Sequence, residues 1–180
     1  MSLRATALAL IGLSPALLGA EGWKPLLNRK DLTGFERVGK ARWTTEDGVL
    51  VGASTADNPA TGWLVSEKEF ADFRLRLKFW ITPGGNSGVA VRDPSHARGV
   101  RSPAHNGYEI QIYDGADAQN PTGSIYGLAP AADGKLKSGQ WNELLIACKG
   151  PHIEVELNGE KVSEVEHDRS RRGAIGFQLH

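Results

Sequence analysis

Hydrophobic and polar residues alternate one by one along much of this chain. The clearest run covers residues 73–81, where apolar side chains are separated by Arg74, Arg76, Lys78 and Trp80. A period of two is typical of a β-strand with one buried face. Shorter runs of this kind occur at 48–52, 63–66, 88–92, 108–113, 143–148, 153–157 and 174–179. No sustained helical period follows Glu21, so we predict an all-β protein.

The dipeptide Asn158-Gly159 lies between two alternating segments and predicts a hairpin, because Asn-Gly readily adopts the two positive φ angles of a type I′ turn. Short strands separated by turns in a chain with 22 Gly and 9 Pro favour two antiparallel sheets packed as a sandwich or jelly roll, with a barrel as second choice. No repeat or linker is visible, so we expect one domain over residues 21–180.

Residues 1–20 follow a different pattern. Arg4 is the only charge before Glu21, and a short apolar run is followed by Pro15 and small residues. This order is typical of a secretory signal peptide, and the apolar run is shorter than the roughly 20 residues of a membrane anchor, the alternative. We predict cleavage after Ala20, or else after Ala16, and a periplasmic or secreted domain with no membrane attachment.

The composition excludes one class of binding partner and one kind of catalytic residue. The chain has 21 Lys and Arg against 21 Asp and Glu, and it has no basic run that could neutralise several phosphates, so nucleic acid is not expected as a partner. The single cysteine, Cys148, lies in an apolar run and is expected to be a buried thiol rather than a nucleophile.

Two segments are longer than ordinary connections, which favours a functional role over mobile, solvated loops. Residues 93–107 carry His96, Arg98, Arg101 and His105, and residues 114–140 carry Asp117, Thr122, Ser124, Tyr126 and Asp133.

Polar residues gather on one face of several predicted strands. In 108–113, alternation places Glu109, Gln111 and Tyr113 opposite an apolar face. If they share a sheet, residues 86–92 and 174–180 would extend this face into a polar concave surface suited to a polyhydroxylated ligand; their contributions are Asn86, Gly88, Ala90, Arg92, Gln178 and His180. The alternative is an ordinary solvated face.

Common catalytic signatures are missing: the chain contains no Gly-x-Ser-x-Gly, His-Glu-x-x-His, phosphate loop or EF-hand motif. A retaining glycosidase needs two carboxyl groups about 5–5.5 Å apart. Glu109 has an amide, Gln111, two residues on, and Asp114 faces the other way unless a bulge intervenes. Double displacement from this strand is therefore disfavoured.

A set of motifs in fixed order resembles the 3-keto-disaccharide hydrolase domain family, which includes 3-keto-glucoside 1,2-lyases and 3-keto-2-hydroxy-glucal hydratases. The motifs are Gly22-Trp23-Lys24-Pro25-Leu26-Leu27-Asn28, Lys30-Asp31-Leu32-Thr33-Gly34, Gly85-Asn86-Ser87-Gly88 with Arg92, Gly107-Tyr108-Glu109-Ile110-Gln111-Ile112, Thr122-Gly123-Ser124-Ile125-Tyr126-Gly127, Trp141-Asn142 and Gln178-Leu179-His180. The resemblance implies a concanavalin A-like jelly roll and cleavage of glycosides oxidised at C3. One base then suffices, because the ketone acidifies the C2 proton.

Carried over to these positions, the resemblance implies Glu109 as general base, with Arg92 and His180 as donors to the enolate or leaving oxygen. It implies sugar-binding roles for Asn86, Gln111, Tyr126 and Gln178, with Asp114 as second carboxylate or orienting group. We expect a glycoside or oligosaccharide substrate and no required cofactor. A divalent cation held by Glu109, His180 and Asp114 is an alternative, since these are hard or borderline ligands.

Two departures from the family stand out. Relatives continue past His180 into one more strand, so we expect an unpaired sheet edge that a strand-completing partner could cover. Lys78 and Trp80 stand where relatives tend to place Glu and Arg, which affects the substrate if that strand lines the cleft. The alternatives to an enzyme are a carbohydrate-binding module, with Trp63, Trp80, Trp141 and Tyr113 as stacking platforms, and a protein-interaction domain.

Overall fold

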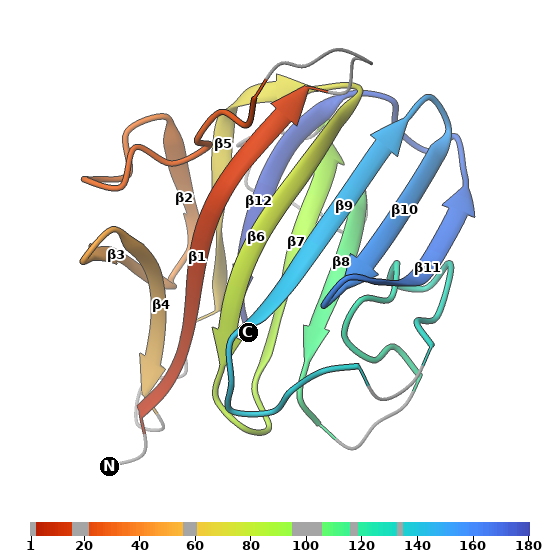
Figure 1. The fold of residues 1–180 in the computed structure, drawn as a ribbon. Coiled ribbons are helices and arrows are strands. Elements are labelled where there is room, and N and C mark those ends of the chain that lie inside the picture. Colours follow the sequence, from red (N-terminus) through yellow and green to blue (C-terminus); the bar gives the residue numbers. More distant parts are fainter. Residues whose placement is uncertain (1–2, 16–21, 56–60, 95–105, 116–118, 133–134) are drawn as a thin grey trace.

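The computed structural model of this chain describes residues 3–15, 22–55, 61–94, 106–115, 119–132 and 135–180. Its regular elements are β-strands arranged in two antiparallel sheets that face each other (Figure 1). This confirms the predicted all-β sandwich. The described residues include no helix of the length and apolarity that a membrane crossing needs.

Sheet A has the order β11-β10-β9-β6-β1-β4-β3. Its strands are β11 (Glu160–Glu166), β10 (His152–Leu157), β9 (Asn142–Lys149), β6 (Phe73–Ile81), β1 (Leu3–Pro15), β4 (Val49–Thr55) and β3 (Arg42–Glu46). Sheet B has the order β2-β5-β12-β7-β8. Its strands are β2 (Phe35–Gly39), β5 (Gly62–Phe70), β12 (Gly173–Leu179), β7 (Asn86–Asp93) and β8 (Tyr108–Tyr113).

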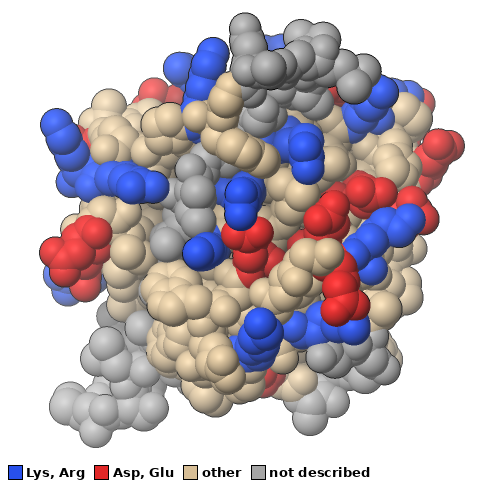
Figure 2. Space-filling model, viewed as in Figure 1, with Lys and Arg blue, Asp and Glu red and all other residues tan. Residues whose placement is uncertain are grey.

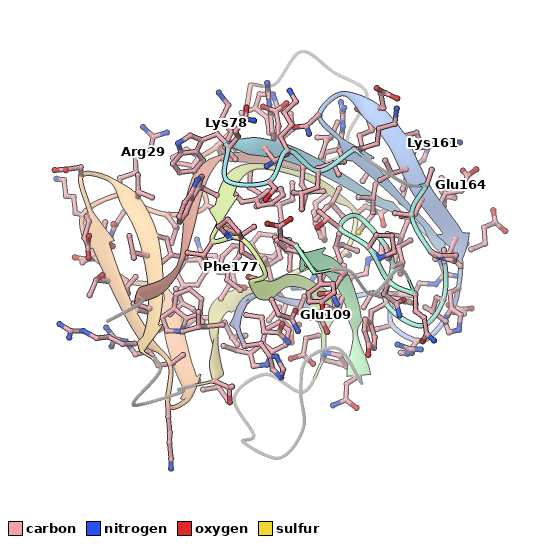
Figure 3. All side chains as sticks on the ribbon, turned by 90° about the horizontal axis from the view of Figure 1, so that it is seen from below. Arg29, Lys78, Glu109, Lys161, Glu164 and Phe177 are labelled. Atoms are coloured by element: carbon pink, nitrogen blue, oxygen red, sulfur yellow. The ribbon has the colours of Figure 1, made fainter. Side chains whose placement is uncertain are left out.

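The core lies between the sheets and is filled by the apolar half of each alternating run. On β6, Leu75, Leu77 and Phe79 are fully buried, as the pattern predicts. Lys78 and Trp80 therefore lie on the outer side of sheet A, whereas Glu109 lies on strand β8 of sheet B (Figure 3 labels Lys78 and Glu109). The two residues that differ from the family pattern, Lys78 and Trp80, therefore do not lie on the polar strands of sheet B.

The predicted hairpin joins β10 and β11. Asn158 has φ 53° and Gly159 has φ 85°, the two positive angles that its turn requires. Cys148 is also buried as predicted, and burial raises the pKa of its thiol to about 12. Both local predictions are confirmed.

Strand β1 covers most of the predicted signal peptide and lies between β4 and β6. It pairs with β4 over Leu3 to Leu8 and with β6 as far as Pro15. The predicted cleavage sites, Ala16 and Ala20, lie outside the described residues. Removal of this segment stays a prediction, as does a strand-completing partner.

Strands β2 and β3 were not predicted from the sequence. Both lie at sheet edges. Only Trp43 is buried in β3, and no residue of β2 is fully buried. An edge strand that buries few side chains has little reason to alternate, so the periodic signal is weak there.

On the face of the molecule seen in Figure 2, basic and acidic side chains are interspersed. This mixed surface agrees with the balanced composition of the chain.

Candidate active site

Sheet B brings the predicted polar strands side by side, with β7 between β8 and β12. The register aligns Gln111 with Gly88, and Gly88 with Gln178. Two residues along, Glu109 is aligned with Ala90. Because residues two apart share a face, these positions form one continuous surface on the side of sheet B away from the core. We call this surface the polar face.

Glu109 is the buried acid of the polar face, with only 6% of its surface exposed. Burial raises the pKa of its carboxyl to about 7, although a hydrogen bond from the Gln178 side chain lowers this pKa in part. Desolvation disfavours the charged form, whereas a donor to the carboxylate favours it. Near neutral pH this group can therefore both accept and release a proton.

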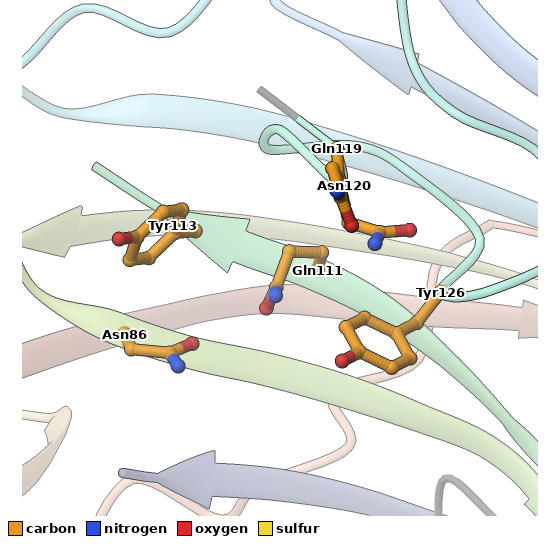
Figure 4. A pocket seen from close by; sticks show the side chains of 6 residues that line it. All are labelled: Asn86, Gln111, Tyr113, Gln119, Asn120 and Tyr126. Carbon is orange, nitrogen blue, oxygen red and sulfur yellow. The ribbon is translucent and has the colours of Figure 1, made fainter. Parts of the chain in front are cut away.

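A pocket of about 230 Å³ opens on the polar face (Figure 4). Glu109 is not part of its lining, but Gln111, two residues along the same face of β8, is. Its lining consists of amides and phenols: Asn86, Gln111, Tyr113, Gln119, Asn120 and Tyr126. Amide and phenol groups both donate and accept hydrogen bonds, as a ligand with many hydroxyls requires. This lining confirms that Asn86, Gln111 and Tyr126, three predicted sugar-binding residues, lie together.

Two amides of the pocket differ in the hydrogen bonds that they make. The Oδ1 atom of Asn86 is buried and has no hydrogen-bond partner among the described residues. A buried acceptor without a partner costs about 1–3 kcal/mol. The Oε1 atom of Gln111 accepts from the Ile112 N–H at 3.1 Å, which leaves the amide nitrogen of Gln111 as the end that donates to a ligand.

Part of the long segment 114–140 contributes to this pocket by folding back along β8. The Tyr126 N–H donates to the Glu109 carbonyl at 2.8 Å, and the Gln111 N–H donates to the Ser124 carbonyl at 2.9 Å. This segment also brings Gln119 and Asn120 into the pocket lining, and neither residue was predicted from the sequence. The signal was present, since two adjacent amides lie in a segment already predicted to be functional by its length.

His180 lies at the far end of the polar face from Glu109. Its Nδ1 atom is 3.1 Å from the Asn86 amide nitrogen, which is a donor, so a neutral His180 carries its proton on Nε2. Asn86 is aligned with Tyr113, four residues from Glu109 on β8, which corresponds to about 13 Å along the strand. His180 and Glu109 are therefore placed for different parts of a ligand.

Arg92 does not belong to the polar face, which corrects its predicted role as a donor to substrate. Its side chain is fully buried. The guanidinium donates to the Ala71 carbonyl at 2.7 Å, the Gly150 carbonyl at 2.7 Å and the Asp72 carboxylate at 3.0 Å. These acceptors lie in the turns before β6 and β10, so Arg92 holds the two sheets together.

The prediction for Arg92 was wrong because of the local backbone conformation. Between the pairs Ala174–Asp93 and Gly176–Ala90, β7 has one more residue than β12, which is a β-bulge. Arg92 lies in this bulge with a left-handed φ of 53°. Strict alternation from Asn86 would leave Arg92 on the polar face, but the bulge turns it to the opposite side.

Asp114 does not line the pocket, and its role as second carboxylate or orienting group stays a prediction. Its carboxylate accepts a hydrogen bond from the Ser138 hydroxyl at 2.6 Å. Within the described residues, Glu109, His180 and Asp114 do not form a three-ligand metal group; the group that does is His152, Glu154 and Glu164, on β10 and the edge strand β11 of sheet A. A cation at Glu109, His180 and Asp114 stays a prediction.

The remaining candidates are dispersed. Of the predicted stacking platforms, Tyr113 lines the pocket, Trp63 is buried and Trp141 is 48% exposed. Several candidates in the two long segments lie outside the described residues: His96, Arg98, Arg101, His105, Asp117 and Asp133.

A family model described as the 3-keto-alpha-glucoside-1,2-lyase-like domain matches residues 22–180. The chain belongs to this family. The match covers both the polar face and the pocket, and it confirms the resemblance found in the sequence motifs.

Individual relatives agree with this assignment. Over 170 residues, the chain is 26% identical to a 3-keto-disaccharide hydrolase of Bacteroides thetaiotaomicron; the match covers 81% of this chain and 59% of that protein. A candidate glycosyl hydrolase from Parabacteroides distasonis superposes with a TM-score of 0.74 at 23% identity, covering 93% of both chains, and so shows the fold. A second one from the same species has a TM-score of 0.68 at 28% identity, covering 88% of this chain and 91% of the other.

Proposed function

We propose that this domain cleaves the glycosidic bond of sugars already oxidised to a ketone at C3, with Glu109 as the base. The observation that carries the proposal is the buried Glu109 carboxyl with a pKa raised to about 7, on the same face of β8 as Gln111, which lines a pocket of amides and phenols. The described residues lining that pocket carry no carboxylate of their own. This arrangement fits a reaction that needs one base better than it fits a double displacement.

The reaction runs in two steps. Glu109 takes the C2 proton, which the C3 carbonyl acidifies, and the C2–H electrons form the enolate. The enolate then expels the C1 oxygen, which leaves as an alcohol after protonation and gives an enone with a C1–C2 double bond. Addition of water across this bond gives the 3-keto sugar, so the sum of both steps is a hydrolysis.

The enolate and the leaving oxygen both need hydrogen-bond donors. Arg92 is not available for this role, and the Gln178 amide already donates to the Glu109 carboxyl. The donors left for the oxidised ring are the Gln111 amide and the Tyr126 hydroxyl, which line the pocket. The Nε2–H of His180 and the Asn86 amide extend the polar face toward its other end. We assign the first pair to the oxidised ring and the second to the sugar attached to it.

The test is to incubate the full chain with 3-keto-trehalose and, separately, with trehalose, and to follow products by NMR. We expect 3-keto-glucose or the enone from the oxidised sugar only, with a primary isotope effect when C2 carries deuterium. Glu109→Gln should lower kcat by about 10²–10⁴-fold. Equal cleavage of both sugars would overturn the proposal.

A carbohydrate-binding module is the second candidate, favoured by the half-exposed ring of Tyr126 beside the pocket amides. It predicts saturable binding of the oxidised sugar with no product, and the same affinity for the wild-type chain and Glu109→Gln. Isothermal titration calorimetry of the wild-type chain and of Glu109→Gln distinguishes this candidate from the enzyme.

We also propose that the protein acts outside the cytoplasm, because residues 1–20 follow the pattern of a signal peptide. N-terminal sequencing of the protein recovered from the periplasm and the culture medium should find Glu21 or Leu17 as first residue. Recovery only from the cytoplasm, with Met1 or Ser2 first, would contradict this location.

A further inference from the structure

We infer that Gly88 is a positioning residue for Glu109: its missing side chain opens the path by which the carboxyl group crosses strand β7 to reach Gln178. The importance of this path for turnover rests on the proposed function. The geometric claim itself concerns only the place of the carboxyl group.

The distance to be crossed shows why a gap is needed. Glu109 lies on β8 and Gln178 on β12, and β7 runs between them, so their backbones are two strand spacings or about 10 Å apart. Their side chains nevertheless form a hydrogen bond. Gly88 is aligned with Gln178 on β12, and it lies directly under the Glu109 side chain.

The three atoms nearest to a side chain at Gly88 all belong to Glu109. A Cβ atom placed on Gly88 would lie 2.3 Å from Glu109 Oε1 and 3.1 Å from both its Cδ and Cγ atoms. Gly88 is not among the glycines with positive φ, so its backbone conformation is open to alanine. Space for Glu109, rather than backbone freedom, is what the glycine supplies here.

Filling this space should lower the reaction rate more than it lowers the stability of the fold. The atoms in the way are the end of a flexible side chain, which can rotate aside, whereas a backbone clash would disturb the strand. Gly88→Ala should therefore fold, but with its Glu109 carboxyl displaced from Gln178 and from the pocket edge. Loss of about 1 Å in the placement of a catalytic group can cost about 10²-fold in rate.

Gly176 offers a matched control on the neighbouring strand. A Cβ atom there would meet Trp63 at 3.3 Å and Ala90 at 3.4 Å, and Glu109 is not among its nearest neighbours. Gly88→Ala should lower kcat at least about tenfold with KM changed less than about threefold, while Gly176→Ala should change both by less than about threefold.

Rescue tests the geometry directly. In the wild-type background, Glu109→Asp should lower kcat, because the shorter side chain draws the carboxyl group back. In the Gly88→Ala background the same substitution makes room for the new methyl group, so it should cause no further loss. Additive losses in the double variant would overturn the inference.

A readout independent of turnover is the titration of Glu109, followed by carbon-13 NMR of its carboxyl group in each variant. Gly88→Ala should shift the midpoint by at least half a pH unit, about 0.7 kcal/mol, and Gly176→Ala should not. If the wild-type chain has no activity but this pattern holds, the positioning role stands and only the proposed function fails. An unchanged midpoint and unchanged kcat in Gly88→Ala would overturn it.

Gly88→Ala could also fail to fold, and a second variant covers that outcome. Removal of the obstructing carboxyl in Gly88→Ala/Glu109→Ala should restore cooperative thermal unfolding if the conflict is with Glu109. If the double variant also fails to fold, Gly88 serves the sheet itself and the inference is wrong.

Discussion

Strand β8 presents Tyr108, Ile110 and Ile112 to the core and Glu109 and Gln111 to the opposite face, and all of them are at most 7% exposed. On the core side, burial of each apolar side chain stabilises the fold by roughly 1.5–3 kcal/mol. On the polar face, burial is unfavourable for a charged group, and this cost appears as the raised pKa of Glu109. Equal burial with opposite energetic sign marks the polar face as built for a ligand rather than for stability.

The largest expected effect on stability comes from the core side of sheet B. Phe177 on β12 is fully buried, and its ring centroid lies 6.2 Å from that of Phe35. Phe177→Ala should lower the free energy of unfolding by about 3–5 kcal/mol in urea titrations, because it leaves a cavity. Its neighbour Gln178 lies on the polar face, and Gln178→Ala should cost far less stability. Equal losses at both positions would remove the distinction between the faces.

The pH dependence of the unfolding free energy of Glu109→Gln measures how much the buried carboxyl on the polar face destabilises the fold. In the folded chain the pKa of Glu109 is raised from 4.5 to about 7, so the wild-type chain loses stability as the pH rises from 4.5 through 7. This loss amounts to about 3 kcal/mol. The variant should match the wild type in urea titrations at pH 4 and exceed it by up to about 3 kcal/mol at pH 9. A variant that is less stable at pH 9 would contradict the shift.

Arg92 tests the boundary between the two faces. Arg92→Lys keeps the charge but loses donors to the carbonyls of Ala71 and Gly150, which should cost about 1–3 kcal/mol of unfolding free energy. Because Arg92 does not touch the polar face, kcat/KM measured well below the melting temperature should change less than about threefold. A tenfold loss of kcat/KM in a fully folded variant would return Arg92 to the active site.

The smallest effect is expected at the pocket rim. Tyr126→Phe removes one hydroxyl from a half-exposed side chain and keeps the ring. The loss of one hydrogen bond to the enolate or the leaving oxygen, about 0.5–1.5 kcal/mol, should lower kcat about two- to tenfold and leave the unfolding free energy unchanged. A rise in KM with constant kcat would instead make Tyr126 a residue that only binds the substrate.

Much of the site follows from local rules. Alternation alone assigned Glu109 and Gln111 to one face and Ile110 to the core, since successive side chains of a strand point to opposite sides. The same rule failed at Arg92, because a bulge adds a residue and resets the alternation. Gln119 and Asn120 were missed because the length of their segment indicated a function, but a segment without periodicity does not show where it folds back.

The sequence by itself determined the strands with alternating residues, the hairpin at Asn158-Gly159 and the two faces of β8, because a period of two and a turn dipeptide are properties of neighbouring residues. Only the tertiary structure decided that β7 lies between β8 and β12, and that residues with the sequence pattern of a signal peptide form a strand between β4 and β6. Strand neighbours depend on pairings between distant segments, which alternation leaves open. The meeting of Glu109 with Gln178 across Gly88 is the functional result of those pairings.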